Sequence, residues 1–135
     1  MGERRKGNVL VVEDDESLLS LFEKVLHQSG FEATASTSLE TAQTLFADHQ
    51  FDALVCDLSV AAGRNIFDFV SAARTRNPDI AVLIVSGYTP EQVALRAQSL
   101  GVTVMDKPFT PPELIARISL LLDRTRGHFR RNIAC

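Results

Sequence analysis

The hydrophobic residues of this chain fall into two kinds of segment that alternate along its length. Short, continuous runs rich in β-branched residues are typical of strands that are covered on both faces, as in a parallel sheet. The clear runs cover residues 8–12, 53–56 and 80–85, and two weaker runs, expected nearer the edges of a sheet, cover 33–36 and 102–105.

Between these runs, apolar residues recur every three or four positions, which predicts amphipathic helices. The expected buried stripes are Leu18, Leu21, Phe22, Val25 and Leu26; Leu39, Ala42, Leu45 and Phe46; Ile66, Phe67, Phe69, Val70 and Ala73; Val93, Ala94, Ala97 and Leu100; and Leu114, Ile115, Ile118, Leu121 and Leu122.

The expected helix ends are marked by particular residues. Gly30 and Gly101 are suited to the positions just after the first and fourth helices. Thr89 and Thr110 each precede a proline and are followed by Gln or Glu three residues later. This pattern predicts Thr as the N-cap and Pro as the first helical residue of the fourth and fifth helices.

A strand followed by a helix, five times over, predicts an α/β fold with a doubly wound parallel sheet and helices on both faces. The length of 135 residues fits a single domain. No apolar stretch approaches the roughly 20 residues that span a bilayer, and the charged N-terminus lacks the features of a signal peptide, so we expect a cytoplasmic protein.

Composition and charge narrow the function classes. Hydrophobic residues make up 45% and charged residues 23% of the chain, which excludes wholesale disorder. The net charge of −3 provides no case for nucleic-acid binding. The basic residues near both chain ends are interpreted as solvated ends, and Cys56 as a small core residue.

The polar residues that follow the strands are the most informative feature. Glu13-Asp14-Asp15, Asp57, Ser86 and Lys107 stand at or just after the ends of four strands, and parallel strands direct these ends to one edge of the sheet. Carboxylates about 4 Å apart repel by about 4 kcal/mol at a protein-like dielectric. A hard cation such as Mg²⁺ relieves that repulsion through oxygen ligands. Capping of the first helix is the alternative for these acids, and we prefer it for Asp15 alone.

The chain resembles the receiver domain of two-component response regulators over residues 8 to about 123, with residues 1–7 as an extension and 124–135 as a basic tail. The motifs that carry the resemblance are Val-Leu-Val-Val-Glu-Asp-Asp-Glu at 9–16, Val-Cys-Asp-Leu at 55–58, Val-Leu-Ile-Val-Ser-Gly-Tyr at 82–88 and Lys-Pro-Phe at 107–109. The resemblance implies a flavodoxin-like (βα)5 fold with strand order 2-1-3-4-5.

The resemblance also implies a function. Asp57 would accept a phosphoryl group from a phosphohistidine of a sensor histidine kinase or a histidine phosphotransfer protein. Ser86 would hydrogen-bond that group and Lys107 would pair with it, and the Lys107–Pro108 peptide bond would be cis. The protein would catalyse only its own phosphorylation and dephosphorylation, and would otherwise not be an enzyme.

The implied cofactor is Mg²⁺. Asp14 and Asp57 would bind it directly, Glu13 would help through a water molecule, and the backbone carbonyl of Ser59 would supply a further oxygen. Partner contacts, and a homodimer, would use the face of the fourth and fifth helices, where Arg96 and Arg117 can face solvent. We expect no membrane contact and no direct DNA binding, while the downstream target is unknown.

The chain departs from the family pattern at several positions. Ala61 and Asn65 stand where receivers usually carry Pro and Gly, with Gly63 between them. Val104 replaces the usual aromatic residue of the fifth strand, which predicts that the signal acts mainly through the loop from Ser86 to Thr89.

Three alternatives remain open from the sequence. A phosphohydrolase with an aspartyl nucleophile would need an acid at position 59, where this chain has Ser. A nucleotide-binding domain would need a glycine-rich loop after the first strand. A pseudo-receiver would bind its partner without phosphorylation. The chain is expected to be either a stand-alone receiver or part of a longer protein.

Overall fold

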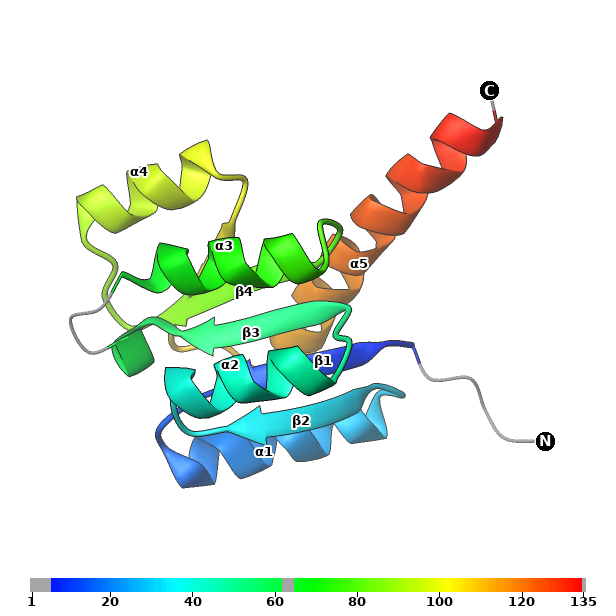
Figure 1. Ribbon diagram of the computed structural model, residues 1–135. Coiled ribbons are helices and arrows are strands. Elements are labelled where there is room, and N and C mark those ends of the chain that lie inside the picture. Colours follow the sequence, from blue (N-terminus) through cyan, green and yellow to red (C-terminus); the bar gives the residue numbers. More distant parts are fainter. Residues whose placement is uncertain (1–5, 62–64, 135) are drawn as a thin grey trace.

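The computed structural model describes the backbone of residues 6–61 and 65–134, and the side chains of these residues up to Thr125 (Figure 1). Gly63, the Arg4-Arg5 pair and Cys135 lie outside the described residues. The elements in chain order are β1 (Asn8–Val12), α1 (Glu16–Gln28), β2 (Glu32–Ser36), α2 (Leu39–Asp48), β3 (Ala53–Asp57), the 3-10 turn η1 (Leu58–Ala61), α3 (Ile66–Arg76), β4 (Ala81–Ser86), α4 (Glu91–Ser99), β5 (Thr103–Asp106) and α5 (Pro111–Ala134).

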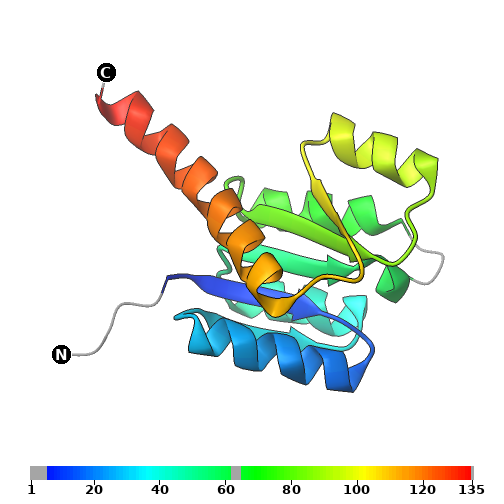
Figure 2. The same cartoon turned by 180° about the vertical axis from the view of Figure 1, so that it is seen from behind.

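The strands form one parallel sheet in the order β2-β1-β3-β4-β5, which confirms the predicted fold class. The central strand, β3, is buried along its whole length. Helices α2 and α3 cover the face that is nearer in Figure 1, and α1 and α5 cover the face seen from behind in Figure 2. The carboxyl end of β3 therefore lies in the middle of one edge of the sheet.

The two faces of the sheet have separate hydrophobic cores, because successive side chains of a strand point to opposite faces. From β1, Leu10 and Val12 pack with buried residues of α2, α3 and α4. Val9 and Val11 pack instead with buried residues of α1 and α5. An apolar residue at almost every position of β1, β3 and β4 is therefore what allows both layers of helices to dock.

The helix ends agree with the sequence in all but one case. Gly30 and Gly101 follow α1 and α4 with φ of 97° and 67°, values that favour glycine. Thr110 caps α5: its Oγ1 accepts a hydrogen bond from the Glu113 amide at 3.3 Å, and the Glu113 carboxylate accepts one from the Thr110 amide at 3.1 Å.

The predicted N-cap of α4 is wrong. The helix begins one residue later than expected, so that Pro90 instead of Thr89 occupies the N-cap position. Proline offers no side-chain acceptor, and no side chain of the described part of the chain caps α4. The ψ of Pro90, 147°, is extended and keeps this residue out of the helix, and in the loop before it Ser86 hydrogen-bonds to the backbone of Tyr88.

Two of the predicted buried stripes need correction. In α1 the stripe runs through Leu19, Phe22 and Leu26, while Leu21 is 42% exposed, because a helix buries a strip about every third or fourth residue. In α4, Ala94 is exposed and Ala97 is the buried residue of the helix. This helix is therefore anchored to the sheet by little apolar surface.

Helix α5 continues well past the sheet. Its first half packs through Leu114, Ile118 and Leu122, whereas its second half projects away from the body of the protein (Figures 1 and 2). At about 1.5 Å per residue, its 24 residues span about 36 Å. The predicted basic tail thus starts inside this helix, and its separation from the domain stays a prediction.

Burial predicts opposite outcomes for two leucines of α5. Leu114 is fully buried and Leu120 is 45% exposed. Leu114→Ala should lower the free energy of unfolding by about 2–5 kcal/mol, because it removes buried methyl groups and leaves a cavity. Leu120→Ala, the matched control, should change it by less than about 0.5 kcal/mol. Urea unfolding measures both, and equal losses would contradict the assigned orientation of α5.

Candidate functional site

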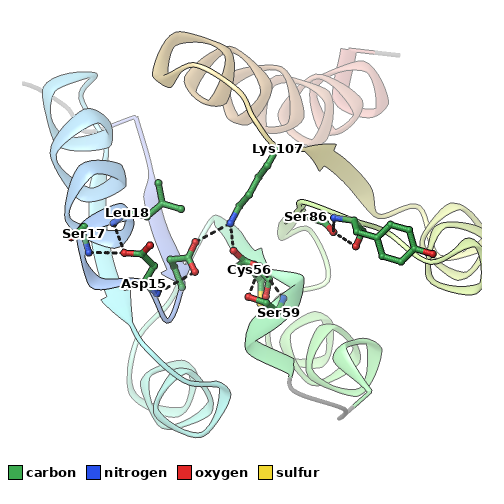
Figure 3. Close-up of polar contacts among 10 residues, drawn as sticks. Asp15, Ser17, Leu18, Cys56, Ser59, Ser86 and Lys107 are labelled. Atoms are coloured by element: carbon green, nitrogen blue, oxygen red, sulfur yellow. Dashed lines mark hydrogen bonds and ion pairs between the residues drawn. The ribbon is translucent and has the colours of Figure 1, made fainter.

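Four strand ends place polar side chains at the same edge of the sheet (Figure 3). Asp57 is the last residue of β3 and Ser86 the last of β4, while Glu13 and Lys107 directly follow β1 and β5. Three of these side chains are nearly inaccessible: Glu13 is 1%, Ser86 2% and Asp57 3% exposed. A buried polar group needs partners, and their pattern defines the site.

Lys107 lies between the two buried carboxylates. Its Nζ is 3.2 Å from Glu13 Oε1 and also forms an ion pair with Asp57 Oδ2. The Lys107 side chain retains 28% of its exposure, so the ammonium closes the pocket on its solvent side. The peptide bond between Lys107 and Pro108 is cis, as the resemblance implies.

Ser59 holds the other oxygen of Asp57. Both its amide and its hydroxyl donate hydrogen bonds of 2.8 Å to Asp57 Oδ1. Each carboxylate oxygen of Asp57 thus has its own donors, which orient the group. The sequence analysis considered only the Ser59 carbonyl. The signal it missed is local, because an Asp side chain commonly accepts from the backbone two residues later.

The two buried carboxyl groups titrate as a pair. Burial, reinforced by a hydrogen bond to Asp57 and by its charge, raises the pKa of Glu13 from 4.5 to about 7. Burial alone would raise the pKa of Asp57 as well, but hydrogen bonds with Lys107, Glu13 and Ser59 together lower it. The charge at neutral pH is therefore concentrated on Asp57, the central group.

The pKa of Lys107 is shifted by the negative charges of Asp57 and Glu13. Burial would lower its pKa, but its hydrogen bond and charge interaction with Asp57, followed by those with Glu13, outweigh that effect and raise the pKa. The ammonium therefore stays protonated. A permanent cation beside an ionised, oriented carboxylate is an arrangement that stabilises negatively charged oxygen atoms.

Ser86 is close to this site but is turned away from it (Figure 3). Its Oγ donates to the Tyr88 carbonyl oxygen at 2.5 Å and accepts from the Tyr88 amide at 3.1 Å. A Cβ added at Gly87 would meet no atom within 4 Å, so the approach beside Ser86 is open. The structure thus brings together Glu13, Asp57 and Lys107, and leaves Ser86 bonded to its own loop.

The remaining acids have different surroundings. Asp15 caps α1, accepting hydrogen bonds from the amides of Ser17 and Leu18 at 3.0 and 3.2 Å. Asp14 is exposed at the rim. Within the part of the chain that the structure describes, no three acidic, His or Cys side chains are grouped to hold a metal ion. Glu13 and Asp57 are the two carboxylates that share Lys107.

A parallel sheet in this order, with a buried carboxylate at the end of its central strand and a lysine facing it, defines a signalling domain of the receiver type. The model of the response regulator receiver domain matches residues 9–119. The chain belongs to this family, as the sequence motifs had indicated.

Similar proteins agree with this assignment. The response regulator SaeR of Staphylococcus aureus is 26% identical over 127 residues, which cover 93% of this chain and 55% of SaeR. The chain therefore spans about half the length of this relative. A receiver protein of Sinorhizobium medicae has a solved structure that is 28% identical, with a TM-score of 0.77 over 91% of this chain and 98% of that one.

Another solved structure supports the fold alone. A receiver domain described as CheY-like, from Methanospirillum hungatei, is 18% identical and has a TM-score of 0.83 over 93% of this chain and 99% of that one. Among the described residues, no helix is both long and apolar enough to cross a membrane.

The raised pKa of Glu13 predicts an unusual pH dependence. Because Glu13 keeps its proton to a higher pH when folded than when unfolded, stability should fall as pH rises from about 4.5 to about 7. Over this range the loss should reach up to about 3 kcal/mol. The lowered pKa of Asp57 acts only at more acidic pH, where its contribution is lost.

Urea unfolding between pH 5 and 8, without divalent cations, measures this effect. Glu13→Gln should flatten the pH dependence and exceed the wild type in stability at pH 8. Glu16→Gln, an exposed control, should keep the wild-type dependence. Parallel curves for wild type and Glu13→Gln would show that Glu13 does not hold the proton.

Proposed function

We propose that this receiver domain accepts a phosphoryl group on Asp57 from a phosphohistidine of a sensor kinase or phosphotransfer protein, and that phosphorylation switches its binding to a downstream partner. The observation that supports this most strongly is the Asp57 carboxylate itself. It is ionised, oriented by Ser59 and paired with Lys107 at the edge of the sheet where ligands of such folds bind.

Phosphoryl transfer depends mainly on the positioning of the reacting groups and on the neutralisation of charge, and less on proton transfer. An oxygen of Asp57 forms the new bond to phosphorus, while the bond between phosphorus and the donor's imidazole nitrogen breaks and its electron pair stays on that nitrogen. Lys107 faces Asp57 Oδ2 and would pair with the negative oxygens of the transferred group. Ser59 holds Oδ1, so that Asp57 keeps one orientation during the reaction.

The donor set fits Mg²⁺. The ion takes oxygen ligands, commonly one or two carboxylates and several waters, and the site offers only oxygens. Burial is the main cause of the raised pKa of Glu13, and the charge of Asp57 adds a repulsion that a cation would relieve. Asp57, exposed Asp14 and the Ser59 carbonyl would hold the ion, with Glu13 acting through water. Bound Mg²⁺ would neutralise charge on the phosphoryl oxygens.

The partner surfaces follow from exposure. Arg96 and Gln98 of α4 and Arg117 of α5 are exposed, so this face is available for the downstream partner or a homodimer. Val104, half-buried and packed against the α2–α3–α4 core, takes the place of the usual ring. We therefore assign the switch to the β4–α4 loop.

We place the protein and its phosphoryl donor in the cytoplasm. The protein would catalyse only its own phosphorylation and dephosphorylation.

Asp57 is predicted to be the phosphorylated residue. Incubation with acetyl phosphate and Mg²⁺ should add one phosphoryl mass to the wild-type protein, because acetyl phosphate supplies the group without a partner. Asp57→Asn should add none and still fold. Asp79→Asn, at the opposite end of β4, is the matched control and should be labelled normally. Intact-protein mass spectrometry decides; labelling of Asp57→Asn would refute the assignment, and an unlabelled wild type would favour the pseudo-receiver alternative.

Mg²⁺ is predicted to stabilise the protein through Asp14. A ligand present at about 100 times its dissociation constant adds about 2.7 kcal/mol to the free energy of unfolding. Asp14→Ala should respond far less to the ion, and should be at least as stable as wild type without it because one negative charge is gone. Asp79→Ala should respond like the wild type. Thermal unfolding with and without millimolar Mg²⁺ measures this, and equal responses of wild type and Asp14→Ala would place the ion elsewhere.

A further inference from the structure

Two hydrogen-bonding groups near the start of α4 lack side-chain partners among the described residues. Thr89 Oγ1 is buried and has no hydrogen-bond partner among the described residues. The helix that begins two residues later is capped by no side chain of the described chain. A buried hydroxyl without a partner is costly, and so are uncapped amides at a helix start. The unpaired Thr89 hydroxyl could accept a hydrogen bond, and the first amides of α4 lack a side-chain acceptor two residues further on.

The same dipeptide forms a complete cap elsewhere in the protein. Thr110-Pro111 begins α5 with Thr as N-cap and Pro as the first helical residue. Thr89-Pro90 precedes α4 in the same way, and Gln92 follows Thr89 by three residues, as Glu113 follows Thr110. The residue before proline prefers extended backbone, which is the conformation that an N-cap requires. The local sequence at α4 thus favours a start that the structure does not adopt.

The backbone of Pro90 differs from a helical residue in one of its two angles. Pro90 has φ of −57° and ψ of 147°. The φ value is already helical, and a helical ψ is about −42°. Rotation about ψ of Pro90 would add this residue to α4 and make Thr89 its N-cap. Ala97 is the buried residue of α4 among those described, and Val93 of its first turn is half-buried against the same core, so the packing that the change must adjust is limited to these contacts.

Ser86 is what holds the loop in its present form. Its hydroxyl makes both hydrogen bonds with the backbone of Tyr88, which restrain the residue just before Thr89 and limit how the Thr89–Pro90 segment can rearrange. A phosphoryl group on Asp57 would compete for the same hydroxyl. Once Ser86 turns toward that group, the loop is free to rotate.

We infer that Thr89 is a latent N-cap of α4: when Ser86 leaves Tyr88 for the phosphoryl group, Pro90 joins the helix and the Thr89 hydroxyl accepts a hydrogen bond from the first turn of α4. This inference rests on the proposed phosphorylation of Asp57. It makes Thr89 a positioning residue of the switch, and it moves the start of α4 on the face that carries Arg96 and Gln98.

The inference requires Thr89→Val to act with opposite sign in the two states. In the resting protein, valine removes a buried hydroxyl that has no partner, so the melting temperature should rise. In the activated state, valine removes a cap. Beryllofluoride with Mg²⁺, which mimics a phosphoryl group on a carboxylate, should therefore bind Thr89→Val at least about fivefold more weakly, equivalent to about 1 kcal/mol for one cap.

Two control variants complete the design. Thr89→Ser keeps the hydroxyl and should bind beryllofluoride with nearly wild-type affinity. Thr110→Val breaks a cap that is already formed, so it should lower the melting temperature of the resting protein and leave the affinity unchanged. Hydrogen exchange adds a local measurement: the Gln92 amide should become protected on activation of the wild type and of Thr89→Ser, but not of Thr89→Val.

Two results would overturn the inference. Thr89→Val could lower the resting melting temperature as Thr110→Val does, which would mean that the hydroxyl is already in use. It could also bind beryllofluoride as tightly as the wild type, which would mean that Thr89 keeps the same surroundings in both states. A wild-type protein that binds no beryllofluoride would overturn the proposed function itself, and the latent cap with it.

Discussion

The contact of Lys107 with the carboxylates of Glu13 and Asp57 is the interaction on which the site depends. Two buried acids at adjacent strand ends would repel each other strongly in a pocket from which water is excluded. The ion pairs with Lys107 and the raised pKa of Glu13 both reduce that repulsion. The same charges that make the resting pocket stable leave Asp57 ionised and oriented, which is what a phosphoryl acceptor needs.

The parallel sheet brings Asp57 and Lys107 together. Its central strand is covered on both faces, so Asp57 stands on a rigid element. The parallel arrangement brings Lys107 to Asp57 across 50 positions of sequence. The segment to which we assign the switch is packed differently, because α4 has a single buried residue among those described and Ser86 hydrogen-bonds to its loop.

The family assignment and the structure address different questions. Membership in the receiver family follows from the match over residues 9–119, while the structure shows what the side chains contact at positions where the chain departs from the family pattern. Asn65 is one of them: its side chain caps α3 by accepting from the Phe67 amide at 2.9 Å. A departure near the site can therefore be a local stabilising contact, and each one has to be judged by what its side chain touches.

The sequence by itself determined the fold class, because runs of apolar residues with two periods, punctuated by Gly30, Gly101 and Thr110, specify elements locally. It also determined which residues end the strands, since parallel topology brings those ends together. Only the tertiary structure decided that Glu13 is buried and shares its charge with Asp57, that the Ser59 hydroxyl orients Asp57, and that α4 starts after Thr89. The burial of Glu13 and its coupling to Asp57 depend on residues that are distant in sequence. The start of α4 depends on a competition between two possible helix starts. A local sequence pattern does not encode either outcome.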